Sequence, residues 1–360
     1  MTTAAAPFVQ SQPPRLSEQI ATARAAVIVR AEIAGDPKTA WAVTKILKDA
    51  SGTVAVGKLI HPRPAPSNDA RLALLISNAD RSISATAISD EAAAYLASLP
   101  RNDDAVERRF RHAIDHLDRA DPVIAADVFA ELAMIDRAAL EAQRARLPAD
   151  VLRKLVDESA TSGEQLGLYG YLLGLCGEPA DAGRLRQRFL NADGFAGGAD
   201  GLAAGYWLLA GEQGLATLET HVLLSEHKSP LHAAAMFEAL RFFRDCEGSP
   251  FSRERLRNAA CCGFTRPDTA DLAIGYLVAG REWDALPRVI ELLDVEDTDP
   301  TRQRAVQVMA VRYLLECRRD ADTTPDNRVL AGNALSQISV TDPDLMRRAT
   351  HLAGGEVDRR

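Results

Sequence analysis

The chain has 360 residues, of which 47% are hydrophobic and 26% are charged, and this length predicts two domains or an extended array instead of one ordinary compact core. Its formal net charge of −8 argues against a nucleic-acid-binding protein, because phosphate binding needs a clustered positive surface. No apolar run approaches the ~20 residues that cross a bilayer, so no membrane span is expected.

The N-terminal stretch 1–14 is rich in proline and is predicted to be a disordered tail. It lacks the basic start and the apolar stretch of a secretory signal. The sequence as written therefore indicates a cytoplasmic protein. If the true start codon lies further upstream, a signal peptide and a cell-envelope or secreted location stay open.

The hydrophobic period changes at Ala25, where short runs rich in Val, Ile and Thr begin. Several alternate apolar and polar residues, as half-buried antiparallel strands do. Together with a short helix over Leu16–Arg24 and a closing helix over Asp90–Leu99, with Asp90 as N-cap, they predict a small antiparallel β domain over residues 15–100. It is expected to be an OB-like barrel or a sandwich. The five strands are expected at Ala26–Ala34, Thr39–Leu47, Thr53–Ile60, Leu72–Ser77 and Ser82–Ser89.

The polar tract 100–104 is the predicted domain boundary, and after it the hydrophobic period is helical. Residues 101–360 are therefore predicted to form an all-α array, which makes the whole chain an α+β, multidomain protein. Asp121 before Pro122 is an expected N-cap. Helices are expected over Ala105–Arg119, Pro122–Ile135, Arg137–Leu147, Ala149–Ser159, Gly163–Cys176, Pro325–Ile338 and Pro343–Leu352.

One pattern recurs within the helical part: helix, Gly-containing turn, helix. The stretch Leu168–Leu190 has it, and similar stretches follow near Tyr206 and Tyr276. The anchors Tyr171, Tyr206 and Tyr276 lie 206 − 171 = 35 and 276 − 206 = 70 residues apart, and two-helix units with a spacing in the mid-thirties are typical of an α-solenoid. Three turn glycines are expected in the left-handed conformation at helix ends: Gly177, Gly211 and Gly280.

With DPVIAADVFAELAMID at 121–136 and LYGYLLGLCGEPADAGRL at 168–185, the helical part resembles HEAT-like or armadillo-type α-solenoid repeats. The whole organisation resembles uncharacterised bacterial proteins that join a short β domain to a helical array. The unit at Arg241 departs from the pattern because it lacks the Tyr, and the unit at Tyr313 lacks the turn Gly. The resemblance implies a fold and a generic scaffolding role.

Two patterns could hold a metal. His112 and His116 share one helix face at a spacing that can bind zinc, but position 113 is Ala where a zincin has Glu, and no third ligand is evident. We therefore predict an exposed His pair. Cys261 and Cys262 are adjacent, and a metal or redox site could be drawn with His227, His232 and Cys246. The favoured interpretation treats the free cysteines as small buried hydrophobes.

Other candidate motifs are incomplete. The Gly-rich stretch 194–201 lacks the preceding strand of a phosphate loop and is predicted to be a flexible connection. The acidic stretch 294–300 lacks the Gly and Glu of a calcium loop and is predicted to be a helix entry. We therefore predict no catalytic residues, no cofactor and no metal ligands.

Aromatic residues recur near the same place in the helical unit. Helical spacing predicts first that they form the core between units, but an exposed stripe could bind a peptide, since interface anchors favour Tyr and Trp. The possible partner-binding aromatics are Tyr169, Tyr206, Trp207, Tyr276 and Trp283.

Two functions remain for test. The first is a non-catalytic protein–protein interaction or scaffold protein that uses an extended helical surface to bind a protein partner. The alternative is an enzyme or metal-binding subunit with a pocket between the β domain and the first helices, where His112, Asp115 and His116 would be the candidate residues.

Overall fold

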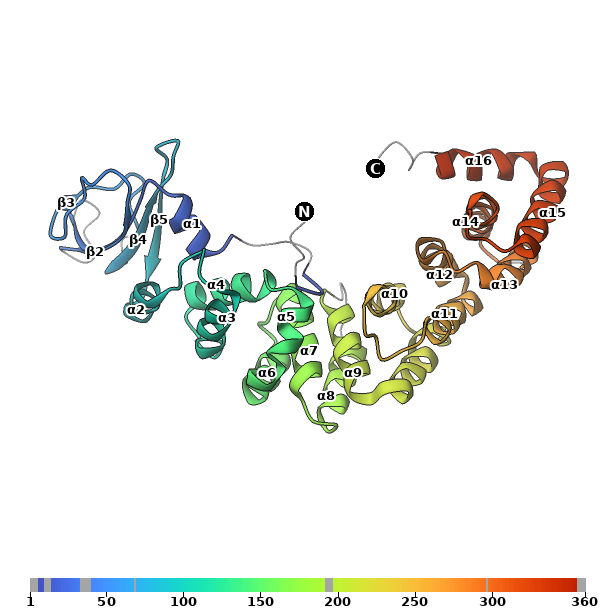
Figure 1. Ribbon diagram of the computed structural model, residues 1–360, viewed down its shortest axis with the longest axis horizontal. Helices are drawn as coiled ribbons and strands as arrows, with labels where there is room; N and C mark the ends of the chain where they lie inside the picture. Colours follow the sequence, from blue (N-terminus) through green and yellow to red (C-terminus); the bar gives the residue numbers. More distant parts are fainter. Residues whose placement is uncertain are drawn as a thin grey trace. The chain divides into compact units, whose positions relative to one another are not determined.

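The computed structural model describes residues 6–9, 14–32, 40–67, 69–191, 197–295 and 297–354. The chain divides into two compact units, residues 1–151 and 152–360. The first contains an antiparallel sheet with flanking helices, and the described part of the second is helical (Figure 1). The fold is therefore α+β and multidomain, as predicted.

The sheet has five strands in the order β3-β2-β1-β4-β5, and every neighbouring pair is antiparallel. Residues 33, 34 and 39, at the ends of the first two expected strands, lie outside the described residues. The prediction for Thr53–Ile60 was wrong except for its last two residues, because a turn with Gly57 at φ +81° interrupts the extended backbone. The elements are α1 (Leu16–Thr22), β1 (Ala25–Ala31), β2 (Trp41–Asp49), β3 (Leu59–Ile60), β4 (Leu72–Ser77) and β5 (Ile83–Ile88).

The inner strands β1 and β4 are buried on both faces of the sheet. Val29, Trp41 and Leu75 belong to a buried cluster on one face. Because side chains alternate along a strand, Ile28 and Leu74 face the other way, and they are buried too. The helix α2 (Asp90–Ser98) packs against β4 and β5. This double burial explains the nearly continuous apolar run of β4.

Four further helices complete the first unit up to its end at Val151. The side chain of Ser89, and not that of Asp90, caps α2, because its hydroxyl accepts a hydrogen bond from Ala92 N at 2.9 Å. Asp121 caps α4 as predicted. The helices are α3 (Val106–Asp115), α4 (Pro122–Ala133), α5 (Arg137–Ala142), which a 3₁₀ turn follows at Arg144–Arg146, and α6 (Ala149–Asp157), which runs across the division.

In the second unit, one series of helices packs each against the next: α7 on α9, α9 on α10, α10 on α12, α12 on α14, and α14 on α16 (Figure 1). The remaining helices flank this series. The unit is thus a helical array. Its α-helices are α7 (Gly163–Cys176), α8 (Asp181–Leu190), α9 (Ala199–Leu218), α10 (Pro230–Asp245), α11 (Arg253–Cys261), α12 (Pro267–Gly280), α13 (Leu286–Glu291), α14 (Pro300–Arg319), α15 (Pro325–Thr341) and α16 (Pro343–Gly354).

The turn glycines differ from the prediction. Gly211 has a positive φ of 55°, at a kink inside α9, but its ψ of −142° is not that of a left-handed helix. Gly177 is extended, and after Gly280 the left-handed residue is Arg281. Close approach accounts for Gly177 instead, because a Cβ there would lie 2.5 Å from Leu173 O.

Glycines also set the distance between α7 and α9. A Cβ on Gly205 of α9 would overlap the backbone oxygen of Gly170, and a Cβ on Gly174 of α7 would overlap the backbone of Gly205. The two helices therefore touch backbone to backbone. Leu166–Gly174 is buried without interruption, which places α7 at the centre of this unit's core.

We predict that Gly205→Ala will lower the free energy of unfolding by about 1–3 kcal/mol, because the added methyl group must push two backbones apart. Gly332→Ala is the matched control, since Gly332 is in mid-α15 with nothing within 4 Å of its Cβ position; that change should instead stabilise by about 0.5–1 kcal/mol. Denaturant unfolding of both variants checks this, and equal effects would contradict the backbone contact.

Candidate functional site

The five candidate aromatics are core residues of the second unit. Their exposed fractions run from 0% for Trp207 and Tyr276 to 8% for Trp283. Trp207 packs against Phe243 with ring centroids 6.0 Å apart, and Trp283 packs against Tyr313 at 5.1 Å. These five rings are therefore buried packing residues, as helical spacing predicted first, and they do not form an exposed binding stripe.

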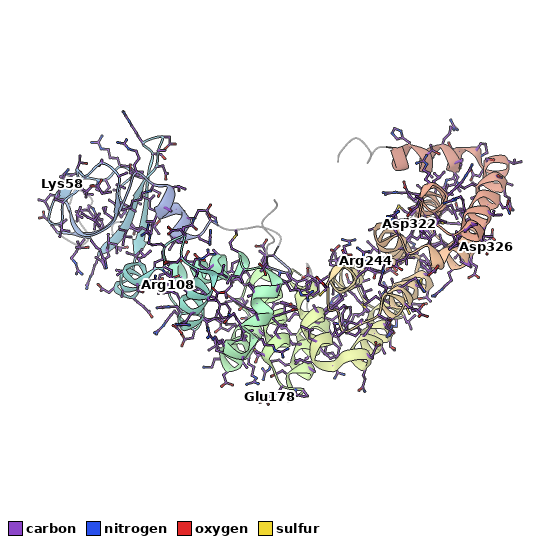
Figure 2. The ribbon with its side chains drawn as sticks, viewed as in Figure 1. Lys58, Arg108, Glu178, Arg244, Asp322 and Asp326 are labelled. Carbon is purple, nitrogen blue, oxygen red and sulfur yellow. The ribbon has the colours of Figure 1, made fainter. Side chains whose placement is uncertain are left out.

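Tyr276 shows how these rings pack in the core. Arg244 lies over its ring, 4.8 Å from the centroid, and donates a hydrogen bond to Tyr276 O at 2.9 Å. The side chain of Arg244 is labelled in Figure 2. Burial raises the pKa of the Tyr276 phenol well above its ordinary value. The ring is thus a packing element that links α10 to α12.

The histidine pair is half-buried, not exposed as predicted. His112 and His116 stack with ring centroids 4.5 Å apart, and both rings contact Tyr95. Burial, with the neighbouring His116 charge, lowers the pKa of His112 to about 4. His112 is therefore neutral near pH 7 and packs as an aromatic. Asp115 of the same helix is exposed.

The cysteine constellation is not assembled. Cys261 is buried and Cys262 half-buried, and burial raises the pKa of both thiols. His232 is buried against Phe189, with ring centroids 5.5 Å apart. Among the residues that the structure describes, no group of three His, Cys, Asp or Glu side chains is placed to hold a metal ion.

The two remaining motifs have structural explanations where they can be followed. Asp299 caps α14, because its side chain accepts a hydrogen bond from Thr301 N at 2.9 Å. Arg302 holds the pKa of Asp297 below its ordinary value. The acidic stretch is thus a helix entry, and its residue 296 lies outside the described part. Residues 194–196 of the Gly-rich stretch are also outside it, and Gly201 lies against the α7 backbone.

The sequence analysis missed a pair of buried carboxylates on α4. Asp127 and Glu131 are 3% and 4% exposed. Asp127 accepts hydrogen bonds from the Tyr95 hydroxyl and from Leu16 N, both at 2.6 Å. Its neighbour Glu131 accepts one from the Ser17 hydroxyl at 2.7 Å. These bonds join α4 to α1, which precedes the sheet in the chain, and to α2, which follows it.

Two arginines neutralise this pair. Arg15 and Arg109 each lie 3.4 Å from Glu131 Oε2, with side chains 9% and 13% exposed. Both carboxylates are engaged in hydrogen bonds or ion pairs that join helices of the unit, so the cluster has a structural role. The sequence did contain a signal of this pair. Two acidic residues lie at i and i+4 of an otherwise apolar helix, and this spacing places both on one helix face.

The cluster also explains why α4 belongs to the same unit as the sheet. The expected boundary was the tract 100–104, but the chain divides between Val151 and Leu152. Helices after the tract belong with the sheet because buried charges on α4 find their partners on α1 and α2. A buried carboxylate left without such partners would cost several kcal/mol.

Burial raises the pKa of Asp127 to about 6, and burial also raises that of Glu131. Since the folded-state pKa of Asp127 exceeds the unfolded value, the folded chain binds the proton more tightly. The contribution of this group to stability is therefore greatest below about pH 4 and is lost as the pH rises through about 6.

We predict that the free energy of unfolding of the wild type, minus that of Asp127→Asn, will fall by on the order of 2–3 kcal/mol between pH 4 and pH 7. Subtracting the variant's free energy of unfolding cancels the contributions of His112 and of the ion-paired carboxylates, whose stabilisation changes with pH in the opposite direction. Denaturant titrations at several pH values measure it. Asp69→Asn, at an exposed position of the same unit, is the control and should give a flat difference; an equally flat curve for Asp127→Asn would refute the assignment.

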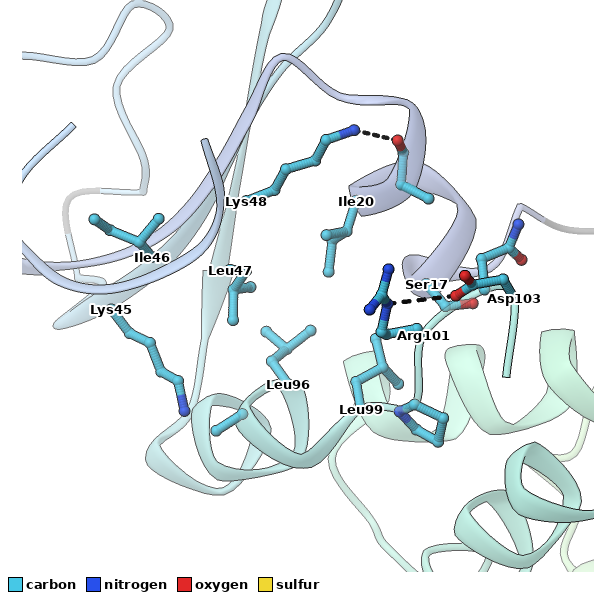
Figure 3. A pocket seen from close by; sticks show the side chains of 14 residues that line it. Ser17, Ile20, Lys45, Ile46, Leu47, Lys48, Leu96, Leu99, Arg101 and Asp103 are labelled. Atoms are coloured by element: carbon cyan, nitrogen blue, oxygen red, sulfur yellow. Dashed lines mark hydrogen bonds and ion pairs between the residues drawn. The ribbon is translucent and has the colours of Figure 1, made fainter. Parts of the chain in front are cut away.

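A cleft of about 610 Å³ opens beside this cluster, within the first unit. Ser17 and Asn102 line it, and Arg15 donates to Asn102 Oδ1 at 2.8 Å. Its walls are the second half of β2, the end of α2 and one side of α1 (Figure 3). The histidines 112 and 116 are not among its lining residues.

A second hollow, an open groove of about 980 Å³, lies on the second unit between α14 and α16. Its apolar part is formed by Ala305, Val308 and Met309 of α14. Arg304, Arg347 and Arg348 line it too, and all three are within 3.4 Å of Asp344. The groove thus combines apolar surface with an excess of guanidinium groups.

Comparison with known proteins returned no match to a protein-family model, to a curated protein or to a solved structure. Among the helices that the structure describes, none has both the length and the apolar composition needed to cross a bilayer.

Proposed function

We propose that this chain is a non-catalytic interaction or scaffold protein, and that its second unit is a HEAT-like or armadillo-type repeat array that binds a protein partner. The series from α7 to α16 supports the repeat interpretation, since each of its helices packs against the next one in the series. Solenoid repeats of this kind bury a continuous core and offer extended surfaces for binding.

The observation that carries the proposal is the groove between α14 and α16. The side chains of Arg347 and Arg348 are 79% and 62% exposed, although they share one carboxylate, Asp344. Arg is enriched at the anchors of protein interfaces, and an apolar floor beside exposed guanidinium groups suits a partner segment that carries acidic side chains. Charge complementarity of this type steers association.

We predict that the double variant Arg347→Glu/Arg348→Glu will lose about tenfold or more of the partner protein retained by the full-length chain, because the reversed charges repel an acidic segment. Quantitative mass spectrometry after affinity purification from the native host measures the loss. Arg318→Glu/Arg319→Glu is the control, since these residues are exposed on α14 but do not line the groove.

Circular dichroism must show that both double variants fold. If the groove variant retained every partner as the control does, the binding surface would not be this groove. If neither the wild type nor the control enriched any protein, the scaffold proposal itself would fail.

One observation keeps the enzyme alternative under test: the cleft lies beside the sheet and the first helices, where that alternative expects a pocket. Of the lining residues, Ser17 is a hydroxyl nucleophile, but its proton is donated to a glutamate that two arginines neutralise. The scaffold proposal predicts that His112→Ala/His116→Ala leaves the metal content of the purified protein unchanged. Loss of a bound metal in that variant, measured by elemental analysis, would favour the alternative.

A further inference from the structure

We propose that the open edge of β2 binds an extended, acidic segment of a partner protein, which is added to the sheet as a further strand. The binding site is the cleft of the first unit, so the inference is independent of the groove between α14 and α16. Strand addition is an established mode of peptide recognition, in which backbone hydrogen bonds supply affinity and pockets for alternate side chains supply specificity.

The first half of β2 has neighbours on both sides, but its second half does not. β3 pairs only with Trp41 and Ala42, and Val43 exchanges backbone hydrogen bonds with residues 57 and 58. Beyond Val43, the pairing of β2 is with β1 alone in the part of the sheet that the structure describes. The range 44–49 is therefore a strand edge whose outer backbone groups lack a partner strand.

This edge borders the cleft. Four consecutive residues of β2 line it, from Lys45 to Lys48. The β1–β2 register shifts at Thr44 and Leu47, so the side chains of this range do not alternate strictly. The four consecutive lining residues place this part of the strand along the cleft. A segment lying in the cleft would thus run along the unpaired backbone.

The opposite walls can accept alternate side chains of such a segment. Ile20 of α1 and Leu96 and Leu99 at the end of α2 line the cleft across from β2 (Figure 3). Leu47 extends from β2 toward this apolar wall in the same view. The volume of about 610 Å³ is within the range of ~300–1,000 Å³ that is usual for ligand sites.

Charge selects the kind of segment. Among the described residues that line the cleft, three side chains are cationic and one, Asp103, is acidic. Lys48 donates to Ala21 O, which holds its ammonium group at the cleft, and no ion pair of Lys45 is recorded among the described residues. Arg101 pairs with Asp103 at 3.4 Å, but both side chains are more than 70% exposed, and such surface pairs are weak.

The same lysines disfavour pairing of β2 with a second copy of itself, because like charges would face each other across the new ladder. Lysine on an edge strand is also a common protection against aggregation. That protective role alone would predict no binding of any strand, and the experiment below separates it from a binding site.

The test uses the full-length chain and a fluorescein-labelled eight-residue peptide in which Glu and Val alternate, measured by fluorescence anisotropy. Three further peptides accompany it: two are N-methylated at every second amide, in alternate registers, so that each lacks the donors on one edge, and one has Lys in place of Glu. We expect the Glu–Val peptide to bind, and we expect N-methylation in one of the two registers to abolish binding. The Lys peptide should not bind.

The protein variant Lys45→Glu/Lys48→Glu should weaken binding of the Glu–Val peptide by about tenfold or more. Lys58→Glu is the matched control and should bind as the wild type does, since Lys58 belongs to the same unit (Figure 2) and does not line the cleft. The groove variant Arg347→Glu/Arg348→Glu should also bind normally, which keeps this test separate from that of the proposed function.

Three outcomes would overturn the inference. One is no binding at peptide concentrations up to about 1 mM, the limit of weak specific association, which would leave the lysines only their protective role. The second is equal binding of both N-methylated registers and the parent peptide, which would exclude backbone pairing. The third is equal binding by Lys45→Glu/Lys48→Glu and the wild type, which would place the peptide elsewhere.

Discussion

Helices of the second unit carry apolar residues on more than one side, and only neighbouring helices can bury them. This constraint orders the array. It is strictest at α7, where nine successive residues from Leu166 are buried and where glycines bring the α9 backbone into direct contact. The aromatic anchors fill the next contacts along the series. Since each helix depends on the next, a disturbance at the α7–α9 contact should weaken the whole unit, as expected of arrays stabilised by nearest-neighbour interfaces.

Arginine links the layers of this array from outside the apolar core. Arg153 binds Asp181 through two hydrogen bonds of 2.8 and 2.9 Å. Arg266, only 4% exposed, donates to the backbone oxygens of Val222, Ser225 and Lys228. The planar fork of guanidinium suits such multiple contacts better than an ammonium group does. At these positions the arginines stabilise the fold, whereas Arg347 and Arg348 of the α14–α16 groove stay exposed and give it positive charge.

In the first unit, buried charge adds to the apolar core of the sheet. Asp127 and Glu131 bind groups that precede the sheet and groups that follow it, so the sheet and its helices fold as one body. The outer backbone edge of β2 stays unpaired in the described part of this unit. The two units therefore offer different kinds of surface. One exposes guanidinium groups beside apolar side chains, and the other exposes unpaired strand edge beside lysines, and both would favour acidic partner segments.

The sequence by itself determined the elements whose signals come from residues close together in the chain. The bounds of β4 and α7 were predicted to the residue, and Asp121 and Asp299 cap the helices that they precede, because alternation, helical period and capping act over a few residues. The tertiary structure decided the rest. Arg15 meets Glu131 across 116 positions, and the histidine pair is half-buried because Tyr95 packs on it. Such contacts depend on which elements meet in space, and no local pattern encodes that choice.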